Sequence, residues 1–196
     1  MSDRPGSGVR LGVLASGRGT NLGNLVERGY RVVAVATNRP SSGAAELARR
    51  HGLALGEFPQ SGYPSSEERD LAMRDWLRSH EVEVVVNAGY DRILSPPFVA
   101  AFAGRILNVH PSLLPAFAGG MDAVERALAA GVSVTGCTVH LVTDEVDAGP
   151  VLLQATVPVL AGDTPDTLHR RIQREEHRIL PEAIDLLAQT SASLRQ

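Results

Sequence analysis

The sequence predicts a protein of the α/β class, with a doubly wound, mainly parallel sheet and an antiparallel addition near its C-terminal part. Through roughly the first 110 residues, short runs rich in Val, Ile and Leu alternate with amphipathic segments. Such apolar runs are typical of parallel strands that are buried on both faces. After this alternation ends, two β-rich runs follow one another with only a loop between them, which predicts an antiparallel pair.

The first half of the chain should contain five strands and three helices. The segment from Ser16 to Asn21 is a Gly-rich turn after the first apolar run, which predicts the strand–loop–helix opening of a Rossmann-like fold. Glu67 and Glu68 are the acidic residues that favour a first helical turn. We expect strands at about 9–14, 32–36, 53–58, 82–86 and 106–109, and helices from the Gly-rich turn to about 28, at 44–51 and at about 65–79.

The second half should add the antiparallel pair and two helices. The β-rich runs are 132–142 and 151–157, and a helix is expected before them at 123–130. Asp163, Thr164 and Pro165 are typical of a helix start, so the last helix should run from there to about 188. A chain of 196 residues is long enough for one domain with a sizeable core, so we expect a single domain over 1–196.

The composition excludes several classes of function. The formal net charge is −3, so the chain lacks the basic excess that binds a nucleic-acid backbone. All 19 basic residues are Arg, which excludes a lysine Schiff base and leaves backbone N–H groups, hydroxyls and Arg to hold any phosphate. Cys137 is the single cysteine, so neither an internal disulfide nor a cysteine zinc cluster can form. We expect Cys137 to pack as a small hydrophobic residue.

No segment of the sequence indicates a membrane or an export route. The first eight residues are polar and lack the apolar core of a signal peptide, and no apolar run approaches the ~20 residues that span a bilayer. We therefore expect a cytoplasmic protein, either a monomer or a homodimer. Its partners should be small molecules, with no nucleic acid and no membrane among them.

The Gly-rich turn allows two interpretations. Gly17 and Gly19 match part of a dinucleotide-binding motif, but Leu22 stands where a third glycine is expected. The second strand runs into Arg39 instead of ending in an acid, and because Arg39 could suit a 2′-phosphate, NADP stays an alternative. The turn also offers backbone N–H groups at a helix N-terminus, which form a cradle for a phosphate. These N–H groups belong to Gly19, Thr20 and Asn21.

Three polar residues form a candidate catalytic trio, namely Asn108, His110 and Asp147. Asn108 and His110 lie at the carboxyl end of a predicted strand, where ligands of open α/β sheets bind. Because strand side chains alternate with period two, both should face the same side. An amide can stabilise an oxyanion, an imidazole exchanges protons near neutral pH, and a carboxylate can orient the imidazole and raise its pKa. The trio therefore indicates acyl transfer.

Other polar residues have plainer interpretations. By composition alone, Asp144, Glu145 and Asp147 would form a solvated turn. Together with His140 they could hold a metal ion, but their spacing matches no familiar ligand pattern, so no metal is expected. The remaining histidines should be solvated because they fall at helix ends or on charged helical faces. They are His51, His80, His169 and His177.

Four segments of the chain are similar to the motifs of a known family. They read Ser-Gly-Arg-Gly-Thr-Asn at 16–21, Ala-Gly-Tyr-Asp-Arg-Ile-Leu at 88–94, Asn-Val-His-Pro-Ser-Leu-Leu-Pro at 108–115, and Gly-Cys-Thr-Val-His through Asp-Ala-Gly-Pro at 136–150. These segments resemble the glycinamide ribonucleotide formyltransferases, which are folate-dependent enzymes of purine synthesis. The resemblance implies the formyltransferase fold, with a nucleotide-binding half at about 9–110 and a folate-binding and catalytic half at about 111–188.

The resemblance also implies a reaction and its site. The formyl group of the co-substrate 10-formyltetrahydrofolate would pass directly to the amine of 5′-phosphoribosylglycinamide, with His110 as proton donor and no metal. Catalysis would fall to Asn108, His110 and Asp147. The glycinamide ribonucleotide would contact Gly19, Thr20, Asn21, Gln173 and Glu176. The folate would contact Arg92, Ile93, Leu94, Asn108, Thr143, Asp144, Glu145, Val146 and Asp147.

One segment departs from the family pattern. Residues 116–123 lack the histidine that many relatives carry in this loop, so we assign the loop no substrate contact, although Gly119 and Gly120 are compatible with a mobile flap. Two alternatives to the implied reaction remain. A formyltetrahydrofolate hydrolase, or a formyltransferase for another amine, would use the same trio. A catalytically silent nucleotide- or folate-binding module would bind a ligand without turnover.

Overall fold

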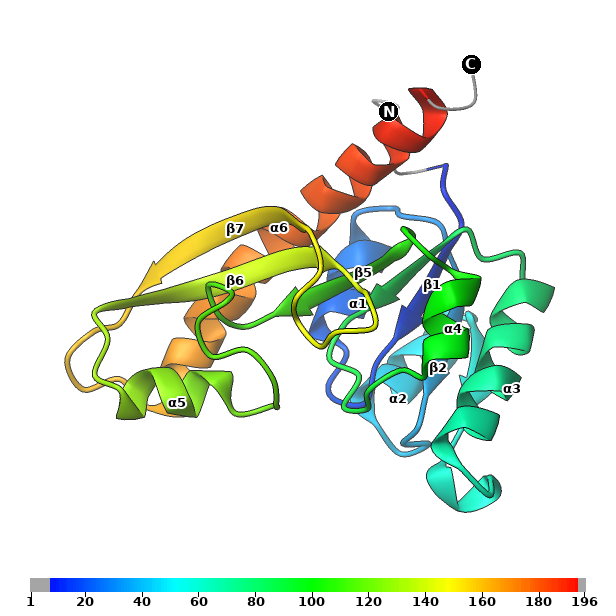
Figure 1. Ribbon diagram of the computed structural model, residues 1–196, viewed down its shortest axis with the longest axis horizontal. Helices are drawn as coiled ribbons and strands as arrows, with labels where there is room; N and C mark the ends of the chain where they lie inside the picture. The colour runs from blue at the N-terminus through cyan, green and yellow to red at the C-terminus, as the bar shows by residue number, and fades with distance from the viewer. Residues whose placement is uncertain (1–7, 194–196) are drawn as a thin grey trace.

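A seven-stranded mixed sheet forms the centre of the computed structural model, which describes residues 8–193 (Figure 1). The strands are β1 (Leu11–Leu14), β2 (Val32–Thr37), β3 (Ala54–Glu57), β4 (Val84–Asn87), β5 (Ile106–His110), β6 (Val134–Leu141) and β7 (Val151–Pro158). Their order in the sheet is β3-β2-β1-β4-β5-β6-β7. β1 to β5 are mutually parallel, and β6 and β7 are antiparallel to their neighbours. The predicted mixed sheet is confirmed.

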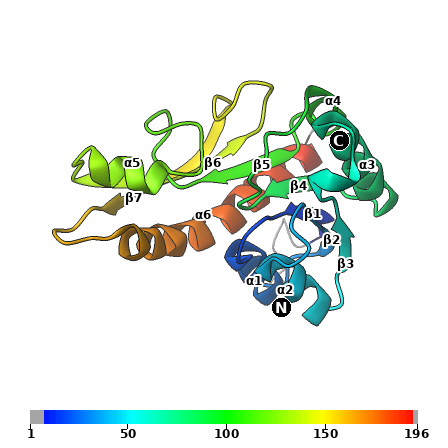
Figure 2. The ribbon, with the colours of Figure 1, turned by 90° about the horizontal axis from the view of Figure 1, so that it is seen from below.

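Helices cover both faces of this sheet. They are α1 (Thr20–Glu27), α2 (Gly43–Arg50), α3 (Ser66–Ser79), α4 (Pro96–Ala101), α5 (Ala123–Ala129) and α6 (Pro165–Ser193), with a short 3-10 helix, η1 (Gln60–Gly62). Figure 2 shows α1, α2 and α6 on one side of the sheet and α3 and α4 on the other. Ser42 and Ser65 cap α2 and α3, because their hydroxyls accept N–H bonds within the first turn. The sheet is therefore doubly wound, as predicted.

The helix α4 is an element that the sequence analysis does not predict. It begins with Pro96 and Pro97, and prolines usually indicate a break in a helical pattern. Both are tolerated here because the N–H groups of a first helical turn have no partner within the helix. Phe98 and Phe102 are fully buried with their ring centroids 5.4 Å apart. They lie in the same core as Met73 of α3, so tertiary burial stabilises this short helix.

The helix α6 is longer than predicted and continues through a proline. Pro181 has no backbone N–H, so the carbonyl of His177 loses its partner within the helix. Asn24 of α1 donates its Nδ2 to that carbonyl at 2.8 Å, and the hydroxyl of Tyr30 donates to the Pro181 carbonyl at 3.1 Å. These bonds hold α6 against α1 and the loop after it, at the point where α6 lacks a hydrogen bond of its own. Within residues 8–193, no helix combines the length and apolar character needed to cross a bilayer.

The carboxyl ends of β1, β4 and β5 lie next to one another in the middle of the sheet. The chain winds outward from β1 to β3 and then returns to β4, so the winding direction reverses between β1 and β4. Such a reversal leaves a crevice at the strand ends, where doubly wound sheets bind ligands. The division of the chain near residue 110 stays a prediction, because the sheet continues from β5 directly into β6.

Candidate active site

A cavity of about 590 Å³ opens at the carboxyl ends of the parallel strands. Its walls come from the loops after β1, β4 and β5, from the loop between β6 and β7, and from α6. Every residue that the sequence analysis assigned to the site lines this cavity, so the fold brings together segments that are distant in the chain. These residues are Gly19, Thr20, Asn21, Arg92, Ile93, Leu94, Asn108, His110, Thr143, Asp144, Glu145, Val146, Asp147, Gln173 and Glu176.

The three side chains of the candidate trio contact one another. His110 Nδ1 lies 3.4 Å from one carboxylate oxygen of Asp147, and Asn108 Nδ2 lies 3.3 Å from the other. Asn108 and His110 are two residues apart on β5 and so face the same side. Asp147 reaches them because the loop between β6 and β7 folds back at Gly149, where any Cβ would collide with the carbonyl of Leu141.

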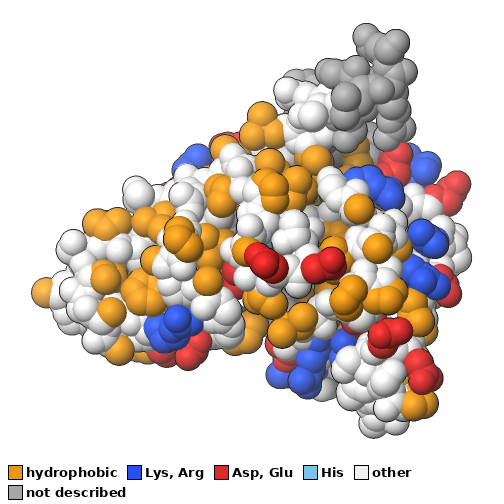
Figure 3. All heavy atoms as spheres, viewed as in Figure 1, with side chains coloured by type: hydrophobic (Ala, Val, Ile, Leu, Met, Phe, Trp, Pro, Cys, Tyr) orange, Lys and Arg blue, Asp and Glu red, His pale blue; other side chains and the backbone are white. Residues whose placement is uncertain are grey.

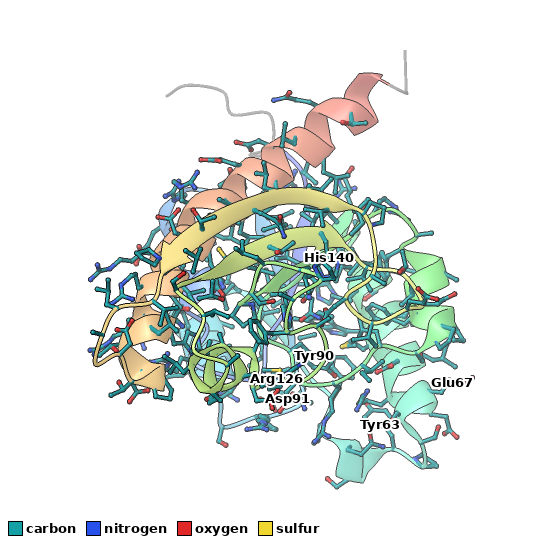
Figure 4. The ribbon with its side chains drawn as sticks, turned by 60° about the vertical axis from the view of Figure 1, so that its left-hand side comes forward. Tyr63, Glu67, Tyr90, Asp91, Arg126 and His140 are labelled. Carbon is teal, nitrogen blue, oxygen red and sulfur yellow. The ribbon has the colours of Figure 1, made fainter. Side chains whose placement is uncertain are left out.

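His140 joins this group, although from the sequence it was considered only as a metal ligand. It lies opposite Asn108 in the antiparallel β5–β6 ladder and is 2% exposed (Figure 4). Its Nδ1 donates to the carbonyl of Leu141 at 2.9 Å, which leaves Nε2 to accept a hydrogen bond. Asn108 Nδ2 donates to that Nε2 at 3.0 Å, which orients the amide. Only the register of β5 against β6 reveals this contact.

Burial and charge act in opposite directions on His110. Burial lowers the pKa of its imidazole below the usual value, while the carboxylate of Asp147 and the carbonyl of Phe117 raise it in part. Burial would raise the pKa of Asp147, but His140, the N–H of Gly119 and His110 outweigh that effect and lower it. Asp147 raises the pKa of His110, as the sequence predicts, but burial is the larger effect. Near neutral pH a neutral imidazole therefore faces an ionised carboxylate.

The loop between β5 and α5 also contacts the trio. The carbonyl of Phe117 lies 3.1 Å from His110 Nε2, and the N–H of Gly119 donates to a carboxylate oxygen of Asp147 at 2.8 Å. Arg126 of α5 donates its Nη1 to three successive carbonyls of this loop, those of residues 117, 118 and 119, at 3.4, 3.0 and 2.9 Å. The carbonyl of Phe117 thus covers Nε2 of His110, the ring nitrogen that would otherwise face a reactant.

The N-terminus of α1 also lines the cavity. Gly19 precedes the helix with φ 76°, and a Cβ there would lie 2.8 Å from the Cα of Ala44, so only glycine fits. No side chain caps this N-terminus. Asn21 is 6% exposed and donates its Nδ2 to Glu176 at 3.0 Å, while its buried Oδ1 has no hydrogen-bond partner. Burial raises the pKa of Glu176 to about 7. This end therefore offers N–H donors together with buried acceptors.

The structure corrects the prediction for three of the histidines. His80 is half-buried, with its ring centroid 4.4 Å from that of Trp76 and its Nδ1 2.8 Å from the carbonyl of the same residue. His169 is half-buried and lines the cavity, and burial together with the charge of Arg18 lowers its pKa. His177 is half-buried too, and its Nε2 has no hydrogen-bond partner. His51 is exposed as predicted. Cys137 is buried as predicted, and burial raises the pKa of its thiol to about 12.

The residues considered for an NADP phosphate and for a metal ion have other surroundings in the structure. Arg39, which could suit a 2′-phosphate, pairs instead with the carboxylate of Asp91. Asp144 and Glu145 are exposed, and Figure 3 shows acidic side chains near the middle of the face where the loop between β6 and β7 lies. In the described part of the chain, no three side chains of His, Cys, Asp or Glu are grouped so that they could hold a metal ion.

Comparisons with known proteins agree with this architecture. A family model described as formyl transferase matches residues 9–184. The phosphoribosylglycinamide formyltransferase of Mycobacterium tuberculosis is 45% identical over 189 residues, which cover 94% of this chain and 87% of that protein. The trifunctional purine biosynthetic protein adenosine-3 of Gallus gallus is 43% identical over 186 residues, and the chain spans 18% of the length of that protein.

A solved structure gives the same result. Glycinamide ribonucleotide transformylase 1 from Symbiobacterium toebii superposes with a TM-score of 0.88 at 47% identity, covering 93% of this chain and 88% of that one. The family model, the Mycobacterium tuberculosis enzyme and the Symbiobacterium toebii structure each match most of this chain. The chain therefore belongs to the formyl transferase family and, within it, to the phosphoribosylglycinamide formyltransferases.

Proposed function

We propose that this protein transfers the formyl group of 10-formyltetrahydrofolate to the amine of 5′-phosphoribosylglycinamide in purine synthesis, and that His110 carries the proton between the two reactants. One observation carries this proposal. The candidate trio lines the same cavity as a helix N-terminus without a side-chain cap and an exposed apolar segment. A phosphorylated amine bound at the first and a folate bound at the second would meet at the trio.

The α1 end of the cavity suits the glycinamide ribonucleotide. Its phosphate would accept N–H bonds from Gly19, Thr20 and Asn21, where the helix dipole favours negative charge. Glu176 and the unpaired Oδ1 of Asn21 would accept hydrogen bonds from the ribose hydroxyls or the amine. Gln173 lies one helical turn before Glu176 and lines the same wall.

Another part of the cavity wall suits a folate ring. Ile93 is 73% exposed and Val146 is 49% exposed, and both line the cavity. Large apolar side chains left open at a cavity wall indicate a surface that a ligand covers. Leu94, which is buried, and residues 143–147 line the same cavity. Arg92 completes this side of the cavity.

The first step of the reaction forms a bond between the amine nitrogen and the formyl carbon. The formyl oxygen then becomes negative, and Asn108 Nδ2 would donate to it. Of the two bonds that Nδ2 makes, the bond to Asp147 at 3.3 Å is longer than the bond to His140 at 3.0 Å, so the oxyanion would displace the former. One donor to an oxyanion is worth about 3 kcal/mol in comparable sites.

The second step moves one proton. The attacking nitrogen releases a proton to neutral His110, directly or through water, and the carboxylate of Asp147 stabilises the imidazolium. His110 then gives this proton to the folate nitrogen as the bond between that nitrogen and the formyl carbon breaks. One C–N bond forms, one breaks, and one proton changes nitrogen, so the balance needs neither a metal nor a covalent intermediate with the enzyme.

The loop between β5 and α5 must move during this cycle. The carbonyl of Phe117 faces His110 Nε2 at 3.1 Å, so this nitrogen reaches a reactant only when the loop shifts. Gly119 and Gly120 have φ values of 72° and 83°, a region that glycine adopts without strain. We therefore propose that substrate binding opens the contact between this loop and His110.

An assay of the purified protein with both reactants tests the proposal. We expect formylated glycinamide ribonucleotide as the product, and a fall in kcat of about 100-fold or more for Asn108→Ala and for His110→Ala. Asp147→Asn should also lower kcat, while His51→Ala, at an exposed end of α2, should match the wild type.

The same assay separates the alternatives. Full activity in His110→Ala would contradict the mechanism. Loss of formyl-folate without formylated glycinamide ribonucleotide would identify a hydrolase or a transferase for another amine. Binding of either reactant without turnover would identify a binding module.

A further inference from the structure

We propose that Asp91 is a positioning residue that joins the loop for the ribonucleotide phosphate to the segment for the folate, so that binding of one substrate favours binding of the other. The inference rests on the proposed function, because that function assigns one substrate to each side of the cavity. Asp91 follows β4 and lines the cavity. Figure 4 shows it next to Tyr90, away from His140 on β6.

The carboxylate of Asp91 joins three loops. Its Oδ1 accepts hydrogen bonds from Asn38 Nδ2 at 2.7 Å and from the hydroxyl of Ser16 at 3.1 Å, and its Oδ2 pairs with Arg39. Ser16 follows β1, whereas Asn38 and Arg39 follow β2. Because β2, β1 and β4 are neighbours in the sheet, one carboxylate ties together three adjacent strand ends.

This carboxylate stays ionised near neutral pH. The Asp91 side chain is 13% exposed, and burial would raise its pKa. Hydrogen bonds from Asn38 and Ser16, with the charges of Arg39 and Arg92, outweigh burial and lower the pKa. Hydrogen bonds to an ionised acceptor are about twice as strong as neutral ones. A neutral side chain of the same shape would therefore hold the three loops less firmly.

Backbone hydrogen bonds extend this network of Asp91 to both proposed substrate regions. The N–H of Asp91 donates to the hydroxyl of Ser16 at 3.0 Å, and the N–H of Ser16 donates to the carbonyl of Gly89 at 3.0 Å. Ser16 directly precedes Gly17, where the phosphate loop begins, and Asp91 directly precedes Arg92 of the folate segment. A shift of either segment therefore strains hydrogen bonds of the other.

Such a network leads to positive coupling between the binding of the two substrates. A ligand that orders one loop removes part of the ordering cost that the second ligand would otherwise meet. Asp91 makes no contact with the candidate trio among its hydrogen bonds and ion pairs. Its loss should therefore weaken binding of both substrates and leave the chemical step nearly unchanged.

The full chain carrying Asp91→Asn tests this inference, because the change keeps the shape of the side chain and removes its charge. Calorimetry would measure the affinity for glycinamide ribonucleotide with and without a non-reactive analogue of 10-formyltetrahydrofolate, and the reverse. In the wild type we expect each ligand to improve the affinity for the other by about fivefold or more. In Asp91→Asn we expect less than about twofold, with both KM values raised about tenfold and kcat changed less than about threefold.

Matched variants serve as controls. Asp75→Asn removes a different aspartate, which pairs with Arg74 on α3, and should leave both affinities unchanged. Arg39→Gln and Ser16→Ala each remove one partner of Asp91 and should give smaller changes of the same kind, which keeps the test informative if Asp91→Asn does not fold. Arg39→Gln should have little further effect when Asp91→Asn is already present, because the two residues share one interaction.

Several outcomes would overturn the inference: no mutual improvement of affinity in the wild type, an unchanged improvement in Asp91→Asn, or a fall in kcat at unchanged KM. When Asp91→Asn does not fold, wild-type coupling in both partner variants would overturn it as well. A wild-type protein that binds both ligands cooperatively but forms no product would contradict the proposed function and leave this inference standing.

Discussion

His110 has two neighbours that a neutral ring cannot satisfy together. Its Nδ1 faces the carboxylate of Asp147 and its Nε2 faces the carbonyl of Phe117, and both of these groups are acceptors. A neutral imidazole has one N–H, so one acceptor lacks a donor. A proton that reaches this ring completes both bonds, while burial keeps the ring neutral until then. This balance suits a residue that receives a proton and passes it on.

His140 makes a testable contribution at the residue scale. It accepts a hydrogen bond from Asn108 Nδ2, so His140→Leu should leave the amide held only by its longer bond to Asp147. Removing an oxyanion donor outright costs about 100- to 1000-fold in kcat, and we expect the loss of its support to cost less, about tenfold, with KM changed little. Steady-state kinetics would measure both constants. His140→Gln, which retains an acceptor, should recover part of the activity, and an unchanged kcat in His140→Leu would contradict the role.

Glu176 links stability to pH. Its pKa is raised from 4.5 to about 7 in the folded chain, so between these values it is ionised when unfolded and protonated when folded. Stability therefore falls as pH rises through this window, and above it the full cost is about 3 kcal/mol. Glu176→Gln removes this cost, so its gain in unfolding free energy over the wild type should be about 2 kcal/mol larger at pH 8.5 than at pH 5.5.

Urea denaturation at the two pH values would measure this gain. Glu175→Gln is the control, because the carboxylate of Glu175, next to Glu176 in the chain, is partly exposed and pairs with Arg178. A gain for Glu176→Gln that does not change with pH would contradict the prediction. The same variant should bind glycinamide ribonucleotide less well, since the buried carboxylate is a proposed ligand.

At the scale of elements, the loop between β5 and α5 depends on one arginine. Arg126 donates to carbonyls of this loop and lies over the ring of Phe117, with 5.8 Å between the guanidinium carbon and the ring centroid. Arg126→Gln should release the loop, so the N–H of Gly119 should exchange with deuterium several-fold faster in the free protein. Mass spectrometry of loop peptides would measure this rate.

Arg105→Gln is a matched control for the loop experiment. Arg105 also donates to backbone carbonyls, those of Glu83 and Ala101, and its guanidinium carbon lies 5.7 Å from the ring centroid of Phe102. None of these groups belongs to the loop between β5 and α5. Exchange in the loop between β5 and α5 should be unchanged in that variant. Equal exchange in the wild type and Arg126→Gln would show that other contacts hold the loop.

Elements differ in how well the sequence predicts them. β2 and β5 are apolar runs that end within a residue of their predicted limits, because continuous burial leaves a clear pattern. α4 is missed, because two prolines hide a helix that only its buried phenylalanines stabilise. α6 ends at Ser193, past its predicted end near residue 188, and bonds from Asn24 and Tyr30 stabilise it where Pro181 lacks an N–H. Local patterns therefore fail where a distant segment supplies the stabilising contact.

At the scale of the whole molecule, we expect the two halves to unfold together. One hydrophobic core contains Leu107 from the first half and Val139 and Ile172 from the second. Trp76, the only tryptophan, lies on α3 in the first half, so its fluorescence reports on that half while circular dichroism reports on all helices. Coincident urea transitions by the two probes would support one cooperative domain.

Glycinamide ribonucleotide at about 100 times its Kd should add about 2.7 kcal/mol to the unfolding free energy by both probes. Transitions that separate by probe, or a gain seen by only one of them, would indicate two independent units.

The sequence by itself determined the fold class and the parallel and antiparallel parts of the sheet, because these depend on local apolar patterns. Its motifs and the family resemblance that they carry indicated many of the residues that line the cavity. Only the tertiary structure decided which of those residues touch. The contact of His140 with Asn108 depends on strand register, the network at Asp91 on strand order, and the pKa values of His110 and Glu176 on burial. Register, order and burial arise from packing between distant segments, and so no local pattern contains them.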